Sequence, residues 1–277
     1  MSQSATVRTL DILDLLSSHP DGLGLTGVCD ALAIPKSVAH RLLAMLVERG
    51  WARQDPVSDR YGLTLKFDLV GLRHYAGTGL TDISQPILDR LAESSGELAR
   101  LAIVDGDGMH WVAKAQGAPY GLRYDPDTGY DVVLHATAVG KVWLATLPEE
   151  RAIRIVEATR YETPKRFGRN VIRTTPAFRK ALADTRARGF GEAVEEGEPG
   201  TSAVAVVVRA SSDAEAPAVG TLSIAGPATR LTTERRAALA QELLAAAREL
   251  SLLWPIRAPS TPQHRPAASA ERSAAHV

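Results

Sequence analysis

The feature that most constrains the fold of this chain is a pair of helical segments separated by a tight turn. Apolar residues recur at three- and four-residue spacing before and after Ala33-Ile34-Pro35, which predicts two helices joined by that turn. We expect the first helix to begin at Thr26 and the second to span residues 36–49, with Gly50 ending it. The second helix is expected to bury four apolar side chains: Val38, Leu42, Met45 and Leu46.

Elements on both sides of this pair complete a small domain. A helix capped by Thr6 is expected before it. The apolar face of that helix should carry Val7, Leu10, Leu13 and either Ile12 or Leu16. After the pair, residues 51–54 and 60–63 predict two short strands around a proline-containing loop the size of a wing. We therefore expect a winged helix-turn-helix domain over residues 1–64 and a connecting helix within residues 65–79.

The pattern of the remaining chain predicts an α+β domain over residues 80–254. Runs rich in β-formers on both sides of Asp105-Gly106-Asp107-Gly108 predict a hairpin, and apolar runs at 203–208 and 219–225 predict buried strands. Helices are expected up to about Gly96 and over residues 138–147, 149–158, 176–188 and 232–253. Helices beside an antiparallel sheet indicate an α/β sandwich. Residues 255–277, rich in Pro, Ala, Ser and Arg, are expected to be a disordered tail.

Several kinds of chemistry are disfavoured by the composition. The single cysteine, Cys29, excludes an internal disulfide and a cysteine-based metal cage, which favours a reducing cytoplasm. The sequence has no apolar run long enough for a membrane span, no histidine pair at zinc spacing and no GxSxG motif. Residues 22–27 match GxGxxG, but a dinucleotide site needs a strand before that motif and a long helix after it. We expect no cofactor, no metal and no membrane partner.

The second predicted helix begins with residues suited to DNA recognition. A recognition helix brings its first turn to the major groove, and the whole chain has no net charge, so the placement of basic residues carries this prediction. Ser37 could instead only cap the helix, and Arg41 could be only a solvated charge. Wing residues suit phosphate contacts better than base contacts. The predicted DNA-binding residues are Thr26, Lys36, Ser37, His40, Arg41, Arg60 and Tyr61.

The stretch LTGVCDALAIPKSVAHRLLAMLVERGWARQDPVSDRYGL resembles the DNA-binding domain of the IclR family of bacterial regulators. LHATAVGKVWLATLP, ARGFGEAVEEGEPGTSAVAVVVR and GTLSIAGP followed by LTTERR resemble that family's C-terminal domain, so the likeness covers residues 6–254. It implies a GAF-like effector domain and dimers that often pair into tetramers on a roughly palindromic operator. It also implies an effector, commonly an organic or aromatic acid, that changes DNA affinity in repressors, activators or both.

The resemblance further implies where an effector binds. Members that bind 2-oxo acids use backbone amides that correspond to Ala138 and Val139, and amides at a helix start suit a carboxylate. Of the positions where those members carry an acid, a thiol and two hydroxyls, only Ser223 is polar here. We therefore expect a larger, more apolar cavity and an effector with more hydrocarbon or aromatic content. The predicted effector-binding residues are Tyr124, Ala138, Val139, Ala193, Ala203, Ser223 and Ala225.

Some roles stay open at this point. Lys141 is either a pocket cation or a helix-capping one, and Glu195-Glu196 is expected to make structural hydrogen bonds rather than to catalyse. The chain could have lost its effector response. Two further classes remain as alternatives: an enzyme that turns over its ligand, for which the sequence offers no nucleophile–base pair, and a winged-helix module that binds a protein.

Overall fold

The computed structural model describes residues 4–118, 120–126, 131–161 and 167–257. The chain forms two compact units that divide between Gly77 and Thr78. Within the ranges just given, no helix has the length and apolar character needed to cross a membrane.

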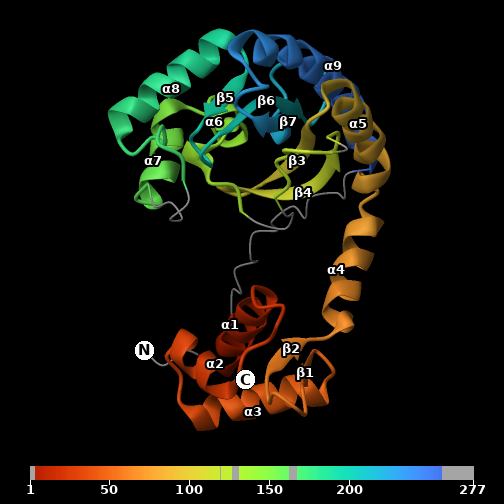
Figure 1. Cartoon of the computed structure of the whole chain (residues 1–277), viewed down its shortest axis with the longest axis vertical. Coiled ribbons are helices and arrows are strands. Elements are labelled where there is room, and N and C mark those ends of the chain that lie inside the picture. Colours follow the sequence, from red (N-terminus) through yellow and green to blue (C-terminus); the bar gives the residue numbers. More distant parts are fainter. Residues whose placement is uncertain (1–3, 119, 127–130, 162–166, 258–277) are drawn as a thin grey trace, which may run out of the picture. The chain divides into compact units, whose positions relative to one another are not determined.

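The first unit consists of helices and a small two-stranded sheet. Its elements are α1 (Ala5–Ser17), α2 (Leu25–Leu32), α3 (Lys36–Glu48), β1 (Ala52–Gln54), β2 (Tyr61–Leu63) and α4 (Leu65–Gly77) (Figure 1). Ala33 adopts a left-handed conformation, with φ of 50°, where α2 turns toward α3. Strands β1 and β2 pair antiparallel, with Ala52 opposite Leu63. The predicted winged helix-turn-helix is therefore confirmed.

The start and the buried face of α1 differ from the prediction. The N-cap is Ser4, whose hydroxyl accepts a hydrogen bond from the backbone N–H of Val7, and not Thr6. Val7 and Leu10 are exposed, and the buried positions of α1 are Ile12 and Leu16. These two buried side chains, four residues apart, lie on one face of the helix and pack it against the core, so its first turn does not need an apolar face.

The buried face of α3 is also rotated from the expected one. Leu42 and Leu46 are buried as predicted, but Met45 is 39% exposed and Val38 is only partly buried. The stripe is completed by Ala39 and Leu43, which are fully buried. Positions 39, 42, 43 and 46 follow the i, i+3, i+4, i+7 pattern of one helix face, and that pattern leaves Met45 at its edge.

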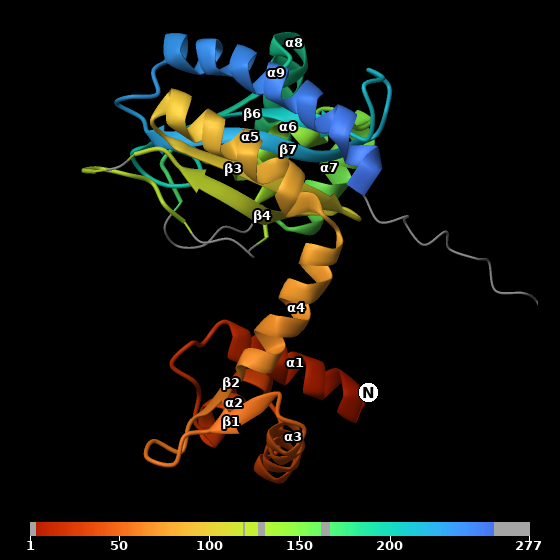
Figure 2. The same ribbon diagram turned by 90° about the vertical axis from the view of Figure 1, so that its right-hand side faces the viewer.

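A five-stranded antiparallel sheet forms the centre of the second unit, in the order β4-β3-β7-β6-β5 (Figure 2). The strands are β3 (Leu98–Asp105), β4 (Gly108–Gln116), β5 (Gly191–Val194), β6 (Thr201–Arg209) and β7 (Ala218–Pro227). The predicted hairpin is β3–β4, and the two predicted late strands are β6 and β7.

Helices cover both faces of this sheet. Helices α5 (Leu80–Ser95) and α9 (Thr233–Arg257) lie on one face. The other face carries α6 (Ala138–Leu144), which packs on β5, β6 and β7, and α8 (Thr175–Arg188) packs on α6. A short 3-10 helix (Leu134–Ala136) precedes α6, and α7 (Glu149–Ala158) packs on α8. The expected α+β class, with an antiparallel sheet in a sandwich, is confirmed.

Side chains that alternate along the strands divide this interior into two cores. Leu101 and Leu222 belong to the core beneath α5 and α9, whereas Ala102 and Ala205 belong to the core beneath α6 and α8. Successive strand residues point to opposite faces, so Arg100, which precedes Leu101, lies on the α6 side. This alternation decides which strand residues can meet α6.

Helix α9 continues to Arg257, past the expected start of the tail at residue 255. The prediction of a disordered tail otherwise falls on residues 258–277, which lie outside the described residues.

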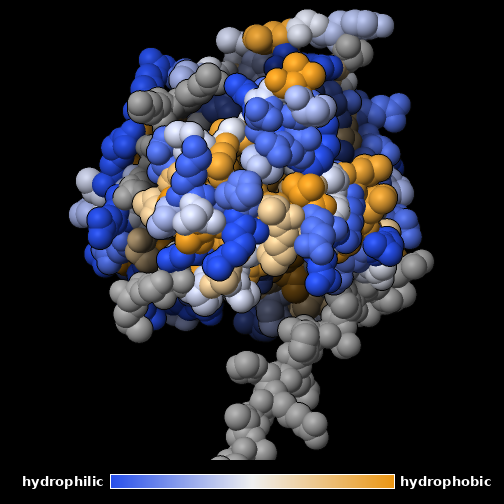
Figure 3. All heavy atoms as spheres, turned by 90° about the horizontal axis from the view of Figure 1, so that it is seen from below, coloured by the Kyte–Doolittle hydropathy of each residue, from blue (hydrophilic) through white to orange (hydrophobic). Residues whose placement is uncertain are grey.

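Exposed apolar side chains are mostly scattered. On the face shown in Figure 3, hydrophobic residues are interspersed with hydrophilic ones, as on ordinary protein surfaces. Helix α4 differs, because Leu65, Leu69 and Leu72 are 68%, 47% and 60% exposed and recur at spacings of four and three residues. Such a stripe marks one helix face that another surface usually covers.

Candidate functional site

The first turns of α3 present a polar, basic surface. Lys36, Ser37, His40 and Arg41 are all exposed, and Thr26 is exposed near the start of α2. Pro35 occupies the N-cap position of α3, so Ser37 is not the cap of this helix. The four α3 residues follow directly after the left-handed turn, which is the position a recognition helix offers to the major groove.

The wing gives a mixed outcome for its two predicted DNA contacts. Arg60 is exposed, whereas the Tyr61 side chain is only 5% exposed and packs in the core of the first unit. The backbone of Tyr61 exchanges two hydrogen bonds with Leu23, at 2.8 and 2.9 Å, which directs its ring inward. The prediction that Tyr61 contacts phosphate is therefore corrected. Arg53 on β1 is exposed and is a further basic residue of the wing.

Hydrogen bonds to one carboxylate hold the loop of the wing. Asp55 accepts the backbone N–H groups of Val57 and Ser58, at 3.1 and 2.8 Å, and the Ser58 hydroxyl at 2.9 Å. The hydrogen bonds from Ser58 are the main reason that the pKa of Asp55 is lowered. The Asp55 N–H donates to the Arg60 carbonyl at 2.8 Å, so this network also fixes the backbone at Arg60.

Two other motifs of the first unit are structural. Gly22, in the GxGxxG match, has a φ of 71°, and a Cβ atom there would lie 2.8 Å from the Tyr61 carbonyl oxygen. The Lys66 ammonium donates to the Arg49 carbonyl at 2.7 Å and lies 4.7 Å from the centre of the Trp51 ring. Gly22 therefore permits a close backbone approach, and Lys66 closes the end of α3 instead of extending the basic surface.

A small pocket in the second unit brings all the predicted effector residues together. It lies between the α6 side of the sheet and residues 124, 136–139 and 196–197, with a cavity volume of about 50 Å³. The predicted residues that line it are Tyr124, Ala138, Val139, Ala193, Ala203, Ser223 and Ala225. Whether they contact an effector stays a prediction.

Strand register explains the floor of this pocket. Ala193 pairs with Ala203, and Ala203 pairs with Ala225, so three methyl groups form a row across β5, β6 and β7. In the row on one side of them, Arg100 of β3 pairs with Ser223 of β7. The pocket floor thus joins an apolar row to a polar pair.

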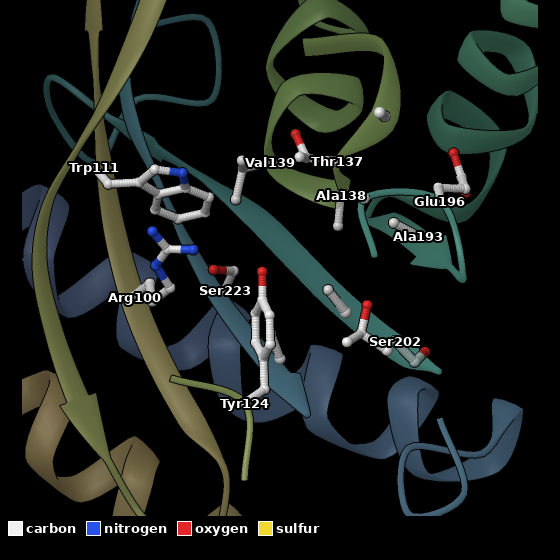
Figure 4. A pocket seen from close by; sticks show the side chains of 15 residues that line it. Arg100, Trp111, Tyr124, Thr137, Ala138, Val139, Ala193, Glu196, Ser202 and Ser223 are labelled. Atoms are coloured by element: carbon white, nitrogen blue, oxygen red, sulfur yellow. The ribbon is translucent and has the colours of Figure 1, made fainter. Parts of the chain in front are cut away.

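Arg100 and Trp111 are pocket residues that the sequence analysis missed. The Arg100 side chain is buried, at 4% exposure, and its guanidinium carbon lies 3.3 Å from the centre of the Trp111 ring (Figure 4). Burial lowers the pKa of Arg100 to about 10, so the group remains a cation at neutral pH. A bulge in β4 places Trp111 opposite Ala102, on the same face of the sheet as Arg100. A charged residue inside the otherwise apolar run LARLAIV was the available signal.

The cavity is therefore less apolar and smaller than expected. Three alanines do line it, but a buried cation stands beside them, and the Trp111 and Tyr124 rings take up space. The larger cavity was expected only from the smaller side chains on β5, β6 and β7. That expectation did not include the bulky side chains that β4 and the segment around residue 124 contribute to the pocket.

Tyr124 reaches the pocket from a segment that has neither helix nor strand. Figure 4 shows its ring in the middle of the pocket, with its hydroxyl group directed toward the region of Arg100 and Ser223. The hydroxyl donates to Glu198 Oε1 at 3.5 Å, and the Tyr124 carbonyl accepts from Gln116 Nε2 at 3.0 Å. Burial of the phenol raises its pKa to about 12. The phenol is therefore neutral and fills a place that a ligand ring would need.

Lys141 forms a buried ion pair. Its ammonium donates to both carboxylate oxygens of Glu196, at 2.6 and 2.8 Å, and both side chains are nearly inaccessible. Burial lowers the pKa of Lys141, and the Glu196 charge opposes that shift. This pair answers the open question on Lys141, since its charge is directed to Glu196. It also agrees with the structural role expected for Glu196.

The start of α6 is closely packed and internally capped. The Thr137 hydroxyl accepts the Gly140 N–H at 3.1 Å. A Cβ atom on Gly140 would lie 2.2 Å from the Leu134 carbonyl oxygen, so only glycine lets α6 approach the preceding 3-10 helix this closely. Ala138 and Val139 line the pocket at this point, as expected.

A wider, more open hollow of about 620 Å³ lies elsewhere in this unit, beside the β3–β4 turn and α7. Several of the ionisable side chains that line it pair with one another, Arg151 with Asp107 and His110 with Asp131. None of the predicted effector residues lies there. Among the described residues, no group of three or more His, Cys, Asp or Glu side chains is arranged to hold a metal ion.

Comparisons with known proteins identify the two domains that carry these residues. The IclR helix-turn-helix domain matches residues 5–56, and the domain described as "Bacterial transcriptional regulator IclR C-terminal" matches residues 74–252. The HTH-type transcriptional regulator BhcR of Paracoccus denitrificans is 31% identical over 244 residues, which cover 88% of this chain and 85% of that protein.

Solved structures show the same fold. The IclR transcriptional regulator from Alicyclobacillus acidocaldarius superimposes with a TM-score of 0.77 at 22% identity, covering 92% of this chain and all of that one. An IclR homologue from Microbacterium hydrocarbonoxydans, complexed with 4-hydroxybenzoate, gives a TM-score of 0.71 at 17% identity, over 90% and 98% of the two chains. The chain thus belongs to the IclR family: it is a DNA-binding transcriptional regulator with an effector-binding domain, and not an enzyme.

Proposed function

We propose that this protein binds an operator through α3 and the wing, and that a small aromatic organic acid in the α6-side pocket changes its affinity for that operator. The observation that carries the effector class is the pocket itself. It joins an apolar floor of three alanines and the Trp111 ring to one buried cation, Arg100. An aromatic ring with a carboxylate matches both parts.

The DNA-binding half of the proposal is supported by exposure at the start of α3. Lys36, Ser37, His40 and Arg41 are free of the helix's buried face and can reach a groove. A roughly palindromic operator would need two copies of the protein, since each recognition helix reads one half-site. The exposed stripe of Leu65, Leu69 and Leu72 on α4 is the surface we assign to a second copy.

The effector class receives support from one relative. The Microbacterium hydrocarbonoxydans homologue is complexed with 4-hydroxybenzoate, an aromatic acid. In this chain the positions expected to hold polar side chains for a 2-oxo acid are mostly alanine, whereas aromatic rings stand around them. Apolar contact should therefore contribute more to affinity here than side-chain hydrogen bonds from β5 and β6.

Operator binding can be tested with the full chain and DNA fragments recovered by in vitro selection. Fluorescence anisotropy over a salt series should give affinity that falls steeply as salt rises, because bound phosphates release counterions. Binding that does not depend on salt would contradict the regulator proposal and favour the protein-interaction alternative.

Effector response can be tested in the same assay. Benzoate, 4-hydroxybenzoate and phenylacetate are added to the operator complex one at a time. At least one should change the operator Kd by about tenfold, which corresponds to a coupling free energy of about 1.4 kcal/mol. Unchanged operator affinity and an unchanged melting temperature with every acid would instead support the loss of effector response.

A further inference from the structure

The recognition helix α3 and the connecting helix α4 meet at a junction that lies outside both the DNA-facing residues and the pocket. Three consecutive backbone carbonyls directly follow α3, and each accepts a hydrogen bond from Thr64 or Lys66. The Arg49 carbonyl accepts from the Lys66 ammonium at 2.7 Å. The Gly50 carbonyl accepts from the Thr64 hydroxyl at 2.6 Å, and the Trp51 carbonyl accepts from the Thr64 N–H at 3.0 Å. The end of α3 and the start of α4 are therefore joined through the backbone.

The Trp51 ring adds side-chain contacts to the same junction. The Lys66 ammonium lies 4.7 Å from the centre of this ring, within the range of a cation–π interaction. The Phe67 ring meets it edge to face, with 6.5 Å between the ring centres and an angle of 76° between the planes. The Trp51 N–H donates to the Leu46 carbonyl of α3 at 2.8 Å. Contacts on several sides of one ring thus fix the angle between the two helices.

This junction is the main anchor of α4 within the first unit. Helix α4 leads away from the two strands of the wing (Figure 1). From Asp68 to Gly77, every residue whose burial the structure describes is exposed. The exposed stripe of Leu65, Leu69 and Leu72, which we assign to a second copy, lies on this helix. The direction in which the stripe faces, relative to α3, therefore depends on the junction.

The junction also lies at the far end of α3 from the residues expected to contact DNA. Lys36 and Ser37 are in the first turn of α3, whereas Thr64 and Lys66 bind the residues that follow its last turn. The 13 residues of α3 give it a length of about 20 Å. A rotation of about 10° at the junction would move the first turn by about 3.4 Å, which is the rise of one base pair. A small change at the junction would thus displace the recognition turn by one position on DNA.

We propose that Thr64 and Lys66 are positioning residues that fix the angle between α3 and α4, and that this angle sets the half-site spacing recognised by two copies of the protein. The inference rests on the proposed function, since it requires two copies joined through α4 on one operator. The Lys66 ammonium is directed to the Arg49 carbonyl and the Trp51 ring, so Lys66 acts through α3 and not on DNA. Part of the operator specificity then comes from residues outside the recognition helix.

Operators with altered spacing can test this inference with the full chain. The selected operator is compared with versions whose half-sites are two base pairs closer or two base pairs further apart, and with a fragment that keeps one half-site. Each added base pair rotates one half-site about the DNA axis by about 35°. Fluorescence anisotropy should show that the wild-type protein binds either altered operator at least about tenfold more weakly. A wild-type protein without a spacing preference would contradict the two-copy operator of the proposed function and this inference together.

Variants of the junction then separate the inference from the proposed function. Thr64→Val removes the hydroxyl that donates to the Gly50 carbonyl without changing the charge, and Lys66→Met removes both contacts of the ammonium. Thr64→Val combined with Lys66→Met should reduce the spacing preference from about tenfold to less than about threefold. Its affinity for the single half-site should stay within about twofold of the wild type, because the first turn of α3 is intact. If the folded double variant keeps the full preference, the inference fails while the proposed function stands.

Conservative variants and a matched charge control complete the experiment. Thr64→Ser keeps the hydroxyl, and Lys66→Arg keeps a cation that can donate and stack, so both should retain the spacing preference. Arg73→Met removes a basic side chain whose Nε–H donates within α4 to the Leu69 carbonyl, and it should also retain the preference. Melting temperature and gel filtration identify folded variants with an unchanged oligomeric state. Loss of half-site binding as large as the loss on the full operator would overturn the inference, and so would an equal loss of preference in Arg73→Met.

Discussion

The two units of this protein place their charges in opposite ways. On α3 the basic side chains of Lys36 and Arg41 are exposed to solvent. In the second unit Arg100 and Lys141 are each only 4% exposed and lie against the sheet. Exposed charges bind a polyanion at little cost to folding, whereas buried charges must be balanced within the fold.

This difference predicts different effects when a charged side chain is removed from each unit. A basic side chain removed from α3 should change DNA affinity and leave stability almost unchanged. Removal of a buried charge from the second unit leaves its buried partner unpaired, so the free energy of unfolding should fall. Stability and ligand affinity, measured on the same variants, therefore test the comparison.

The largest effect is expected from breaking the buried ion pair. Lys141→Met leaves the Glu196 carboxylate, whose oxygens lie 2.6 and 2.8 Å from the ammonium, without its partner in a nearly inaccessible position. We expect the free energy of unfolding of the second unit to fall by about 3–5 kcal/mol, measured by urea denaturation.

Two further variants control that experiment. Lys141→Met combined with Glu196→Leu removes both charges and should recover most of the loss, because an apolar pair of similar volume replaces a buried ion pair well. Lys180→Met breaks an exposed pair with Asp184 and should leave the unfolding midpoint unchanged. A loss as large in Lys180→Met as in Lys141→Met would remove the distinction between exposed and buried charge.

The next effect should appear in DNA binding alone. Arg41→Ala is expected to weaken operator binding by about 1–3 kcal/mol, the range for an arginine that contacts a base. It should change the free energy of unfolding by less than about 0.5 kcal/mol. Arg49→Ala, at the opposite end of α3, is the matched control and should weaken binding much less. Anisotropy gives the operator affinity, and gel filtration should show an unchanged oligomeric state. Equal losses in the two variants would mean that α3 contributes only general charge.

The sequence was most informative where local patterns decide the structure. The turn at Ala33-Ile34-Pro35 and the hairpin at Asp105-Gly106-Asp107-Gly108 were predicted from residues that are neighbours in the chain. The pocket positions on β5, β6 and β7 came from the family resemblance, and all seven predicted residues line one cavity. Neither a local turn nor a position taken from a family resemblance requires knowledge of the three-dimensional packing.

What the sequence did not reveal depends on contacts between distant segments. Arg100 meets Trp111 only because β4 bulges beside β3. Tyr61 turns inward because its backbone pairs with Leu23, a residue far back in the chain. Helical spacing likewise allowed either Met45 or Leu43 on the buried face of α3, and tertiary packing selected Leu43.

The corrected wing yields a smaller effect. Arg60→Ala should reduce the slope of log affinity against log salt by about 0.9, the value for one lost phosphate contact. Tyr61→Phe should leave that slope unchanged, because the Tyr61 side chain is 5% exposed and faces the core. Salt titrations of operator binding measure both slopes. A reduced slope in Tyr61→Phe would mean that its hydroxyl reaches DNA despite its burial.

The smallest effect concerns the pH response of the wing loop. Hydrogen bonds from Ser58 and Val57 lower the pKa of Asp55 in the folded chain, so the loop gains stability above the ordinary aspartate pKa and loses it as pH falls through the lowered value. The protection of the Val57 and Ser58 amides against hydrogen exchange, measured by NMR relative to the intrinsic rate at each pH, should therefore fall below about pH 4, near the unperturbed aspartate value. Asp55→Asn keeps an acceptor oxygen without an ionisable group, and its exchange should show no such transition. A transition of the same size in that variant would assign the pH response to another group. Because the Asp55 N–H also binds the Arg60 carbonyl, the expected result would mean that the placement of Arg60, which we propose contacts phosphate, depends on this local carboxylate rather than on the core.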